Sequence, residues 1–249
     1  MKLNLPGCTT VVALLMNLNI PTAVAAIALD RTRVIYNAGD RAISLSISNE
    51  NKQLPFLAQG WLTDEQGEKN SLPLVVLPPV QRVEPGERSQ IKIQALAAAE
   101  RLPQDRESLF YFNLREIPPR SDKPNTLQIA LQTSIKLFYR PTAIVPGDAE
   151  RLTPWQQQLM LTRLNDRYQI DNPTPYFITL VDARSNHNNT TATGFAPLMI
   201  APRDKSWLGG SLSSLGSAPV LTYVNDYGGR VELKFRCEAD RCRVAKQSQ

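Results

Sequence analysis

The longest alternation of apolar and polar residues in this chain runs from Leu127 to Leu137. One parity is almost entirely apolar and consists of Leu127, Ile129, Leu131, Thr133, Ile135 and Leu137. Such a period of two predicts a β-strand with one buried face, because successive side chains of a strand point to opposite sides of its sheet. The run ends at Arg140-Pro141. Proline cannot donate a ladder hydrogen bond, so we expect a domain boundary near residues 141–146.

Shorter runs of the same kind recur along the chain, whereas long amphipathic helical patterns are absent. In the clearest one, Ile43, Leu45 and Ile47 alternate with serines, as expected for a half-buried antiparallel strand. Turn-forming clusters such as Glu84-Pro85-Gly86 separate the runs. The further expected strands are 56–62, 90–94, 109–114, 158–164, 168–170, 176–182, 219–224 and 231–236, with a polar loop at 185–193. The sequence therefore predicts an all-β fold.

The first 25 residues have the pattern of a secretory signal peptide. Lys2 precedes an apolar run over residues 11–20, and Ala23-Val24-Ala25 offers small residues at the cleavage positions, so we expect the mature protein to begin at Ala26. The apolar run is only about 10 residues, short of the ~20 that a membrane span requires, so we expect no stable membrane insertion. The rest of the 249-residue chain fits two β-sandwiches of roughly 100 residues each, which we place at 26–143 and 144–249.

Two cysteines, Cys237 and Cys242, remain after the expected cleavage. An even pair in an exported chain is more often a disulfide than a metal site, and this spacing suits a staple across a hairpin. We therefore predict a disulfide and no metal centre.

Charge and motif content exclude several functions. The net charge is a modest +5 without a long run of lysine or arginine, which argues against nucleic-acid binding. The single histidine, His187, lies in the polar loop, so no catalytic triad or zinc cluster can be built around it convincingly. No nucleophile elbow, phosphate-binding loop or dinucleotide motif occurs. We expect no catalytic residues and no cofactor.

Several segments resemble the periplasmic usher-pathway chaperones, which assemble pili. These segments are LDRTRVIYN (29–37), NKQLPFLAQ (51–59), PPVQRVEPG (78–86), LPQDRESLFYFNLREIPPR (102–120), LQIALQTSIKLFYRP (127–141), IDNPTPY (170–176) and NDYGGR (225–230). They span both halves of the chain. The resemblance implies two immunoglobulin-like β-sandwiches set at an angle with a cleft between them. It also implies a periplasmic, non-enzymatic chaperone that binds pilin subunits one-to-one and delivers them to an outer-membrane usher.

The resemblance further implies that Arg33 and Lys136 anchor the C-terminal carboxylate of a pilin. Two cations that converge on one carboxylate form charge-assisted hydrogen bonds, which would set the register of the whole guest chain. The alternative is a pair of ordinary solvated cations.

In the same way, Leu127, Ile129 and Leu131 are similar to the residues with which this family donates a strand to an incomplete pilin. The alternative is that the three side chains face the core of their own domain. Lys136 lies on the opposite parity, so a bulge or local twist would be needed if one regular strand held both sets of residues.

Two further sets are implied by the resemblance. Glu107, Arg140 and Asp226 would form a buried charge network between the domains, rather than three independent surface charges. The rigid apolar segment Pro78-Pro79-Val80 would contact the usher, although a proline pair in an antiparallel protein is commonly a device that protects an edge.

Two other classes of function compete with a chaperone. One is a surface-structural or adhesin-type sandwich that becomes part of a fibre, and the other is a periplasmic hydrolase, for which a single loop histidine leaves little room. Which pilins and which usher are served, and whether the free protein self-associates through its exposed strand, stay open at this point.

Overall fold

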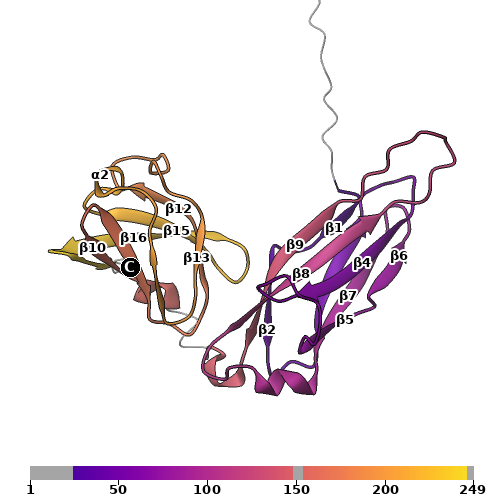
Figure 1. Cartoon of the computed structure of the whole chain (residues 1–249), viewed down its shortest axis with the longest axis horizontal. Coiled ribbons are helices and arrows are strands. Elements are labelled where there is room, and N and C mark those ends of the chain that lie inside the picture. The colour runs from indigo at the N-terminus through magenta and orange to yellow at the C-terminus, as the bar shows by residue number, and fades with distance from the viewer. Residues whose placement is uncertain (1–24, 148–153, 246–249) are drawn as a thin grey trace, which may run out of the picture.

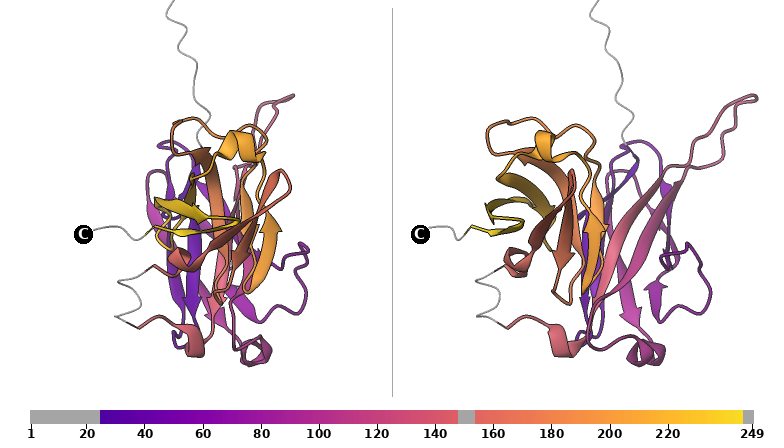
Figure 2. Two further views of the ribbon diagram at one scale, coloured as in Figure 1. Left: turned by 90° about the vertical axis from the view of Figure 1, so that its left-hand side faces the viewer. Right: turned by 60° about the vertical axis from the view of Figure 1, so that its left-hand side comes forward.

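The structure is a computed structural model, of which we describe residues 25–147 and 154–245 (Figure 1). The predicted signal peptide lies outside these residues except for Ala25. The described chain is almost entirely β-structure and forms two sandwiches set at an angle to one another (Figure 1, Figure 2). No helix among these residues is long and apolar enough to cross a membrane.

The first sandwich packs a four-stranded sheet against a five-stranded sheet. In spatial order, the four-stranded sheet holds β1 (Ile27–Leu29), β3 (Ile43–Asn49), β7 (Arg88–Ala95) and β5 (Leu74–Leu77). The five-stranded sheet holds β2 (Arg33–Asn37), β9 (Gln132–Arg140), β8 (Ser108–Ile117), β4 (Phe56–Thr63) and β6 (Val80–Val83). Alternate side chains of both sheets meet in one core that includes Leu45, Ile47, Ile91, Ile93, Phe112, Leu114, Ile135 and Leu137.

Residues 27–37 are divided between the two sheets. β1 pairs with β3 in one sheet, and β2 pairs with β9 in the other, in parallel, from Arg33↔Lys136 to Asn37↔Arg140. On its other flank β9 pairs with β8 from Gln132 to Tyr139. Residues 132–135 of β9 therefore have a strand on one side only, which leaves a free sheet edge beside β2.

The second sandwich is built from one strongly curved sheet of eight strands. Their order is β13 (Leu198–Ile200), β12 (Ile178–Ser185), β15 (Pro219–Val224), β16 (Arg230–Glu238), β17 (Arg241–Val244), β10 (Met160–Leu164), β11 (Arg167–Asn172) and β14 (Asp204–Trp207). The two edge strands, β13 and β14, are consecutive in the chain, so each lies near the other and neither is a long open edge. The core of the second sandwich includes Leu161, Tyr168, Ile170, Leu180, Leu221 and Leu233.

Short helical segments occur only at connections within the described chain. The 3-10 helices are Ala97–Arg101, Thr142–Ile144 and Trp155–Gln158, and α2 spans Leu212–Leu215. The side chain of Ser211 caps α2 by accepting the N–H of Ser214, and the helix ends at Gly216 with a φ of 72°. These caps suit a helix of a single turn, since serine satisfies a free donor and glycine adopts positive φ easily.

The predicted disulfide is present and joins Cys237 in β16 to Cys242 in β17. The two cysteines face each other directly in the ladder of this hairpin. The bond therefore ties the two strands of the hairpin together, as the spacing indicated.

Several predicted strands have different boundaries in the structure, and the strand expected at 176–182 is β12 at Ile178–Ser185. The strand expected from Leu127 begins at Gln132, where its ladder with β8 begins. The carbonyl of Leu131 still accepts the N–H of Glu116, but residues 127–130 have no ladder partner in the described chain. The strand expected at 158–164 begins at Met160, because residues 155–158 form a 3-10 helix.

Candidate functional site

Arg33 and Lys136 lie side by side on the face of the five-stranded sheet that points away from the core. They are direct partners in the parallel register of β2 and β9. Both side chains are partly buried, and burial lowers the pKa of each. The positive charge of Arg33 lowers the pKa of Lys136 further. Two like charges are thus held together in a partly dry place, which is where a bound carboxylate would be most stabilising.

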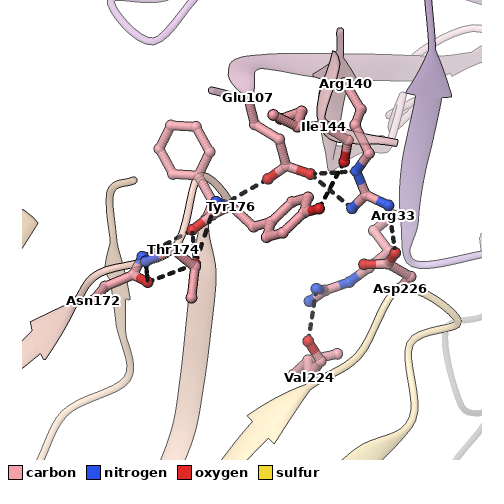
Figure 3. Close-up of polar contacts among 10 residues, drawn as sticks. Arg33, Glu107, Arg140, Ile144, Asn172, Thr174, Tyr176, Val224 and Asp226 are labelled. Carbon is pink, nitrogen blue, oxygen red and sulfur yellow. Dashed lines mark hydrogen bonds and ion pairs between the residues drawn. The ribbon is translucent and has the colours of Figure 1, made fainter. Parts of the chain in front are cut away.

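Both cations reach across to the second sandwich. Arg33 Nη1 donates to the carbonyl oxygen of Val224 at 3.0 Å (Figure 3), and Lys136 Nζ donates to Thr179 Oγ1 at 3.3 Å. The buried Nε of Arg33 has no hydrogen-bond partner, and neither cation forms an ion pair with any carboxylate of the described residues. Both cations are therefore partly buried and bonded to the second sandwich, and Arg33 retains a donor without a partner among the described residues.

The three residues of the expected charge network lie together between the sandwiches (Figure 3). Arg140 donates to Glu107 Oε1 through Nε at 2.9 Å and Nη2 at 2.7 Å, and to Asp226 Oδ2 through Nη1 at 3.0 Å. The side chains of Arg140 and Glu107 are only 5% and 2% exposed. Glu107 Oε2 also accepts the N–H of Phe177, so one carboxylate contacts both domains. Mutual pairing offsets the cost of burying these charges.

Burial raises the pKa of Glu107 to about 7, against the opposing effect of Arg140. Because the pKa of Glu107 is higher in the folded protein than its unfolded value of 4.5, Glu107 contributes its full stabilisation below pH 4.5. That contribution to the unfolding free energy is lost as the pH rises through 7. Between pH 5 and pH 8 we expect wild type to lose up to about 3 kcal/mol of unfolding free energy relative to Glu107→Gln, which cannot titrate. Urea unfolding of both proteins at the two pH values measures this, and parallel pH profiles would contradict it.

Further contacts between the sandwiches were not predicted from the sequence. Arg203 Nη1 pairs with Asp105 Oδ2 at 2.6 Å, and the rings of Phe138 and Phe177 lie 5.7 Å apart. Thr179, which bonds Lys136, was also missed. Nothing local in these segments marks them, since each contact depends on how the two domains meet.

A cavity of about 680 Å³ opens beside the charge network. Both sandwiches line it, the first with Arg33 and Arg140 and the second with Tyr223 and Asp226. Trp155, from the start of the second sandwich, lines it as well. The cavity shows that the two domains leave a cleft beside Arg33 and Arg140.

Leu127, Ile129 and Leu131 lie in the long loop between β8 and β9, which projects beyond the sandwich (Figure 1, Figure 2). Their side chains are 85%, 64% and 40% exposed, so they do not pack in the core of their own domain. Lys136 presents the opposite face of the chain, and the register of β8 and β9 is regular throughout. No bulge is needed, because the three apolar residues lie outside the regular strand that holds Lys136.

Pro78, Pro79 and Val80 form an exposed corner where the chain passes from β5 in one sheet to β6 in the other. The Leu77–Pro78 peptide bond is cis, and the carbonyl of Pro79 accepts the N–H of Gly60 at 2.9 Å. This arrangement fits a turn device as well as a contact surface, so the usher contact stays a prediction.

The fold and this cleft define a class of protein, the two-domain pilus-assembly chaperones. Two family models match: "Pili and flagellar-assembly chaperone, PapD N-terminal domain" over residues 26–145 and "Pili assembly chaperone PapD, C-terminal domain" over 154–235. The chain therefore belongs to the PapD family of pilus-assembly chaperones.

Similar proteins agree with this assignment. The chain is 46% identical over 235 residues to the probable fimbrial chaperone YfcS of Escherichia coli K12, covering 94% of this chain and 92% of that protein. It is 47% identical to the chaperone protein PapD of Escherichia coli, covering 90% and 92%. The SafB chaperone, solved with the Salmonella enterica SafA pilin, superposes with a TM-score of 0.71 at 25% identity, over 87% of this chain and 98% of that one. These comparisons do not support the alternative of a surface-structural or adhesin-type subunit.

Proposed function

We propose that this protein is exported to the periplasm, binds pilin subunits one-to-one, completes their fold with a donated strand and delivers them to an outer-membrane usher. The observation that carries the proposal is the free edge of β9, which connects the exposed residues 127–131 to Arg33 and Lys136. Export rests on the predicted cleavage after Ala25, and delivery on the family. No catalytic step enters the proposal.

Strand addition explains the exposure of this edge. Unpaired N–H and C=O groups of a sheet edge readily pair with another extended chain. A guest strand laid along residues 127–135 would satisfy them, and Leu127, Ile129 and Leu131 would enter a groove of the guest that lacks its own strand. The exposed apolar side chains then become buried in the complex rather than in the free chaperone.

The anchor sets the position of the guest. β2 fills the flank of β9 from Lys136 onward, so a guest strand on the same flank must stop where β2 begins. Arg33 and Lys136 lie at that point, and a C-terminal carboxylate there would receive charge-assisted hydrogen bonds from both.

The apolar residues of the projecting loop provide a direct test. We expect Ile129→Asp to weaken pilin binding at least tenfold, because losing one buried isoleucine costs about 1.5–3 kcal/mol and tenfold corresponds to about 1.4 kcal/mol. Pilin that co-purifies with wild type after periplasmic co-expression serves as the guest, and binding is measured by titration.

Leu54→Asp is the matched control, since Leu54 is an exposed leucine far from β9 in the sequence. Both variants should unfold at the urea concentration of wild type. Equal binding by Ile129→Asp and wild type would refute strand donation through this loop, and a fibre formed by the protein itself would refute the chaperone function.

A further inference from the structure

A carboxylate is buried at the end of the first sandwich, far from the cleft. Glu116 follows Phe112 and Leu114 on the parity of β8 that faces the core, and it is only 6% exposed. Its Oε2 accepts the backbone N–H of Ile27 at 2.8 Å. Because β8 and β1 belong to different sheets, this one side chain connects the two layers of the sandwich.

This carboxylate lacks a cation. Among residues 25–147 and 154–245, no lysine or arginine forms an ion pair with Glu116, and the N–H of Ile27 is the hydrogen-bond partner of its side chain. Burying a carboxylate without a compensating positive charge is unfavourable, since the interior solvates the charge poorly. A positive charge beside it would be strongly stabilising.

Ala26 directly precedes Ile27, whose N–H is bonded to this carboxylate. Adjacent backbone nitrogens are within about 4 Å of one another, so the nitrogen of Ala26 is near the bonded N–H of Ile27. Ala26 is buried, and its carbonyl accepts the N–H of Glu50 at 2.7 Å, which holds the residue in place. In the uncut chain this nitrogen is a neutral amide.

We propose that Glu116 is a binding site for the N-terminal ammonium that signal-peptide cleavage creates at Ala26. Hydrolysis of the bond between Ala25 and Ala26 consumes one water and leaves a carboxylate on Ala25 and an ammonium on Ala26. The ammonium supplies the missing charge at Glu116. Two independent observations meet at this bond, namely the Ala23-Val24-Ala25 pattern in the sequence and the buried carboxylate in the structure.

It follows that processing at this bond stabilises the first sandwich. The inference rests on the proposed export, but it is independent of guest binding. It also gives the position of the cut a physical meaning, since a terminus one residue earlier would place the ammonium farther from Glu116.

A double-mutant cycle on the mature protein tests the proposal. Protein that begins at Ala26 is prepared with a free amine and in an Nα-acetylated form, each with Glu116 and with Glu116→Gln. We expect acetylation to lower the melting temperature by about 3 °C or more in the Glu116 background, and to have no effect in Glu116→Gln. An equal decrease in both backgrounds, or none in either, overturns the proposal.

Glu50→Gln is the matched control, because Glu50 is an exposed acidic residue whose backbone N–H donates to the carbonyl of Ala26. Acetylation should act in this variant as in wild type. If Glu116→Gln does not fold, Glu116→Asp takes its place in the cycle. We then expect a smaller effect of acetylation, because the shorter side chain holds its carboxylate farther from the N-terminal ammonium.

Mass spectrometry of the exported protein tests the position of the cleavage separately. A mature chain that begins at any other residue overturns the proposal whether or not pilin binds.

Discussion

Arg33→Ala and Lys136→Ala are each expected to remain folded and to lose binding to pilin by about ten- to a hundredfold. Each substitution removes charge-assisted hydrogen bonds worth about 1.5–3 kcal/mol to a bound carboxylate, at about 1.4 kcal/mol per factor of ten. The free protein loses little, because the charge of Arg33 already lowers the pKa of Lys136. Removing one of the two like charges relieves that repulsion.

The measurement compares pilin levels in the periplasm and the affinity of purified complexes with the unfolding free energy of each free variant. Lys136→Met separates charge from packing, since it keeps the apolar stem. Arg88→Ala and Lys92→Ala are controls, because both remove exposed cations from β7 in the opposite sheet. Wild-type pilin levels with Arg33→Ala and Lys136→Ala would show that the anchor lies elsewhere.

The second large effect is expected at the charge network. Arg140→Ala leaves Glu107 and Asp226 without their shared cation and should cost about 3–5 kcal/mol of unfolding free energy at pH 8, where Glu107 is ionised. It also removes a guanidinium that lies 5.1 Å from the ring centre of Trp155 and 4.9 Å from that of Tyr176. We therefore expect the two domains to lose their fixed relative position as well as stability.

Arg203→Ala provides the control for this experiment. Arg203 and Asp105 also pair between the domains, but their side chains are 50% and 47% exposed. Exposed pairs contribute at most about 1 kcal/mol, so this variant should unfold nearly as wild type does. Similar losses in both variants would mean that burial does not distinguish the two contacts. Small-angle scattering of the same samples reports whether the angle between the domains changes.

The alternation from Leu127 to Leu137 shows what sequence periodicity can and cannot predict. Ile135 and Leu137 face the core as their parity indicated. Residues 127–131 have the same pattern but form no strand here, because the ladder with β8 ends at Arg115↔Gln132 and only the bond from the N–H of Glu116 to the carbonyl of Leu131 continues it in the described chain. Periodicity records which face is to be buried, but the partner that buries it can be another molecule.

The residues that contact the site from the second sandwich could not be predicted from the sequence, for a different reason. Phe177 directly precedes β12 and Thr179 lies in it, and their contacts with Phe138 and Lys136 depend on the placement of whole domains. Glu116 did carry a signal, because a charged residue on the core parity of β8 is unusual in an otherwise apolar row. Such a residue needs a specific partner, and that requirement could have been recognised in advance.

The placement of β1 and β2 in different sheets has a consequence for the choice of guest chains. On the proposed mechanism, β2 would act as a stop on the flank of β9, so the chaperone itself would align the last residue of a guest chain. Side chains of a strand alternate, and a slip of one residue would turn every one of them to the wrong side. A chaperone that worked in this way would position its client from the C-terminus, and it could serve clients of unlike sequence as long as the spacing from the C-terminus to the groove is the same.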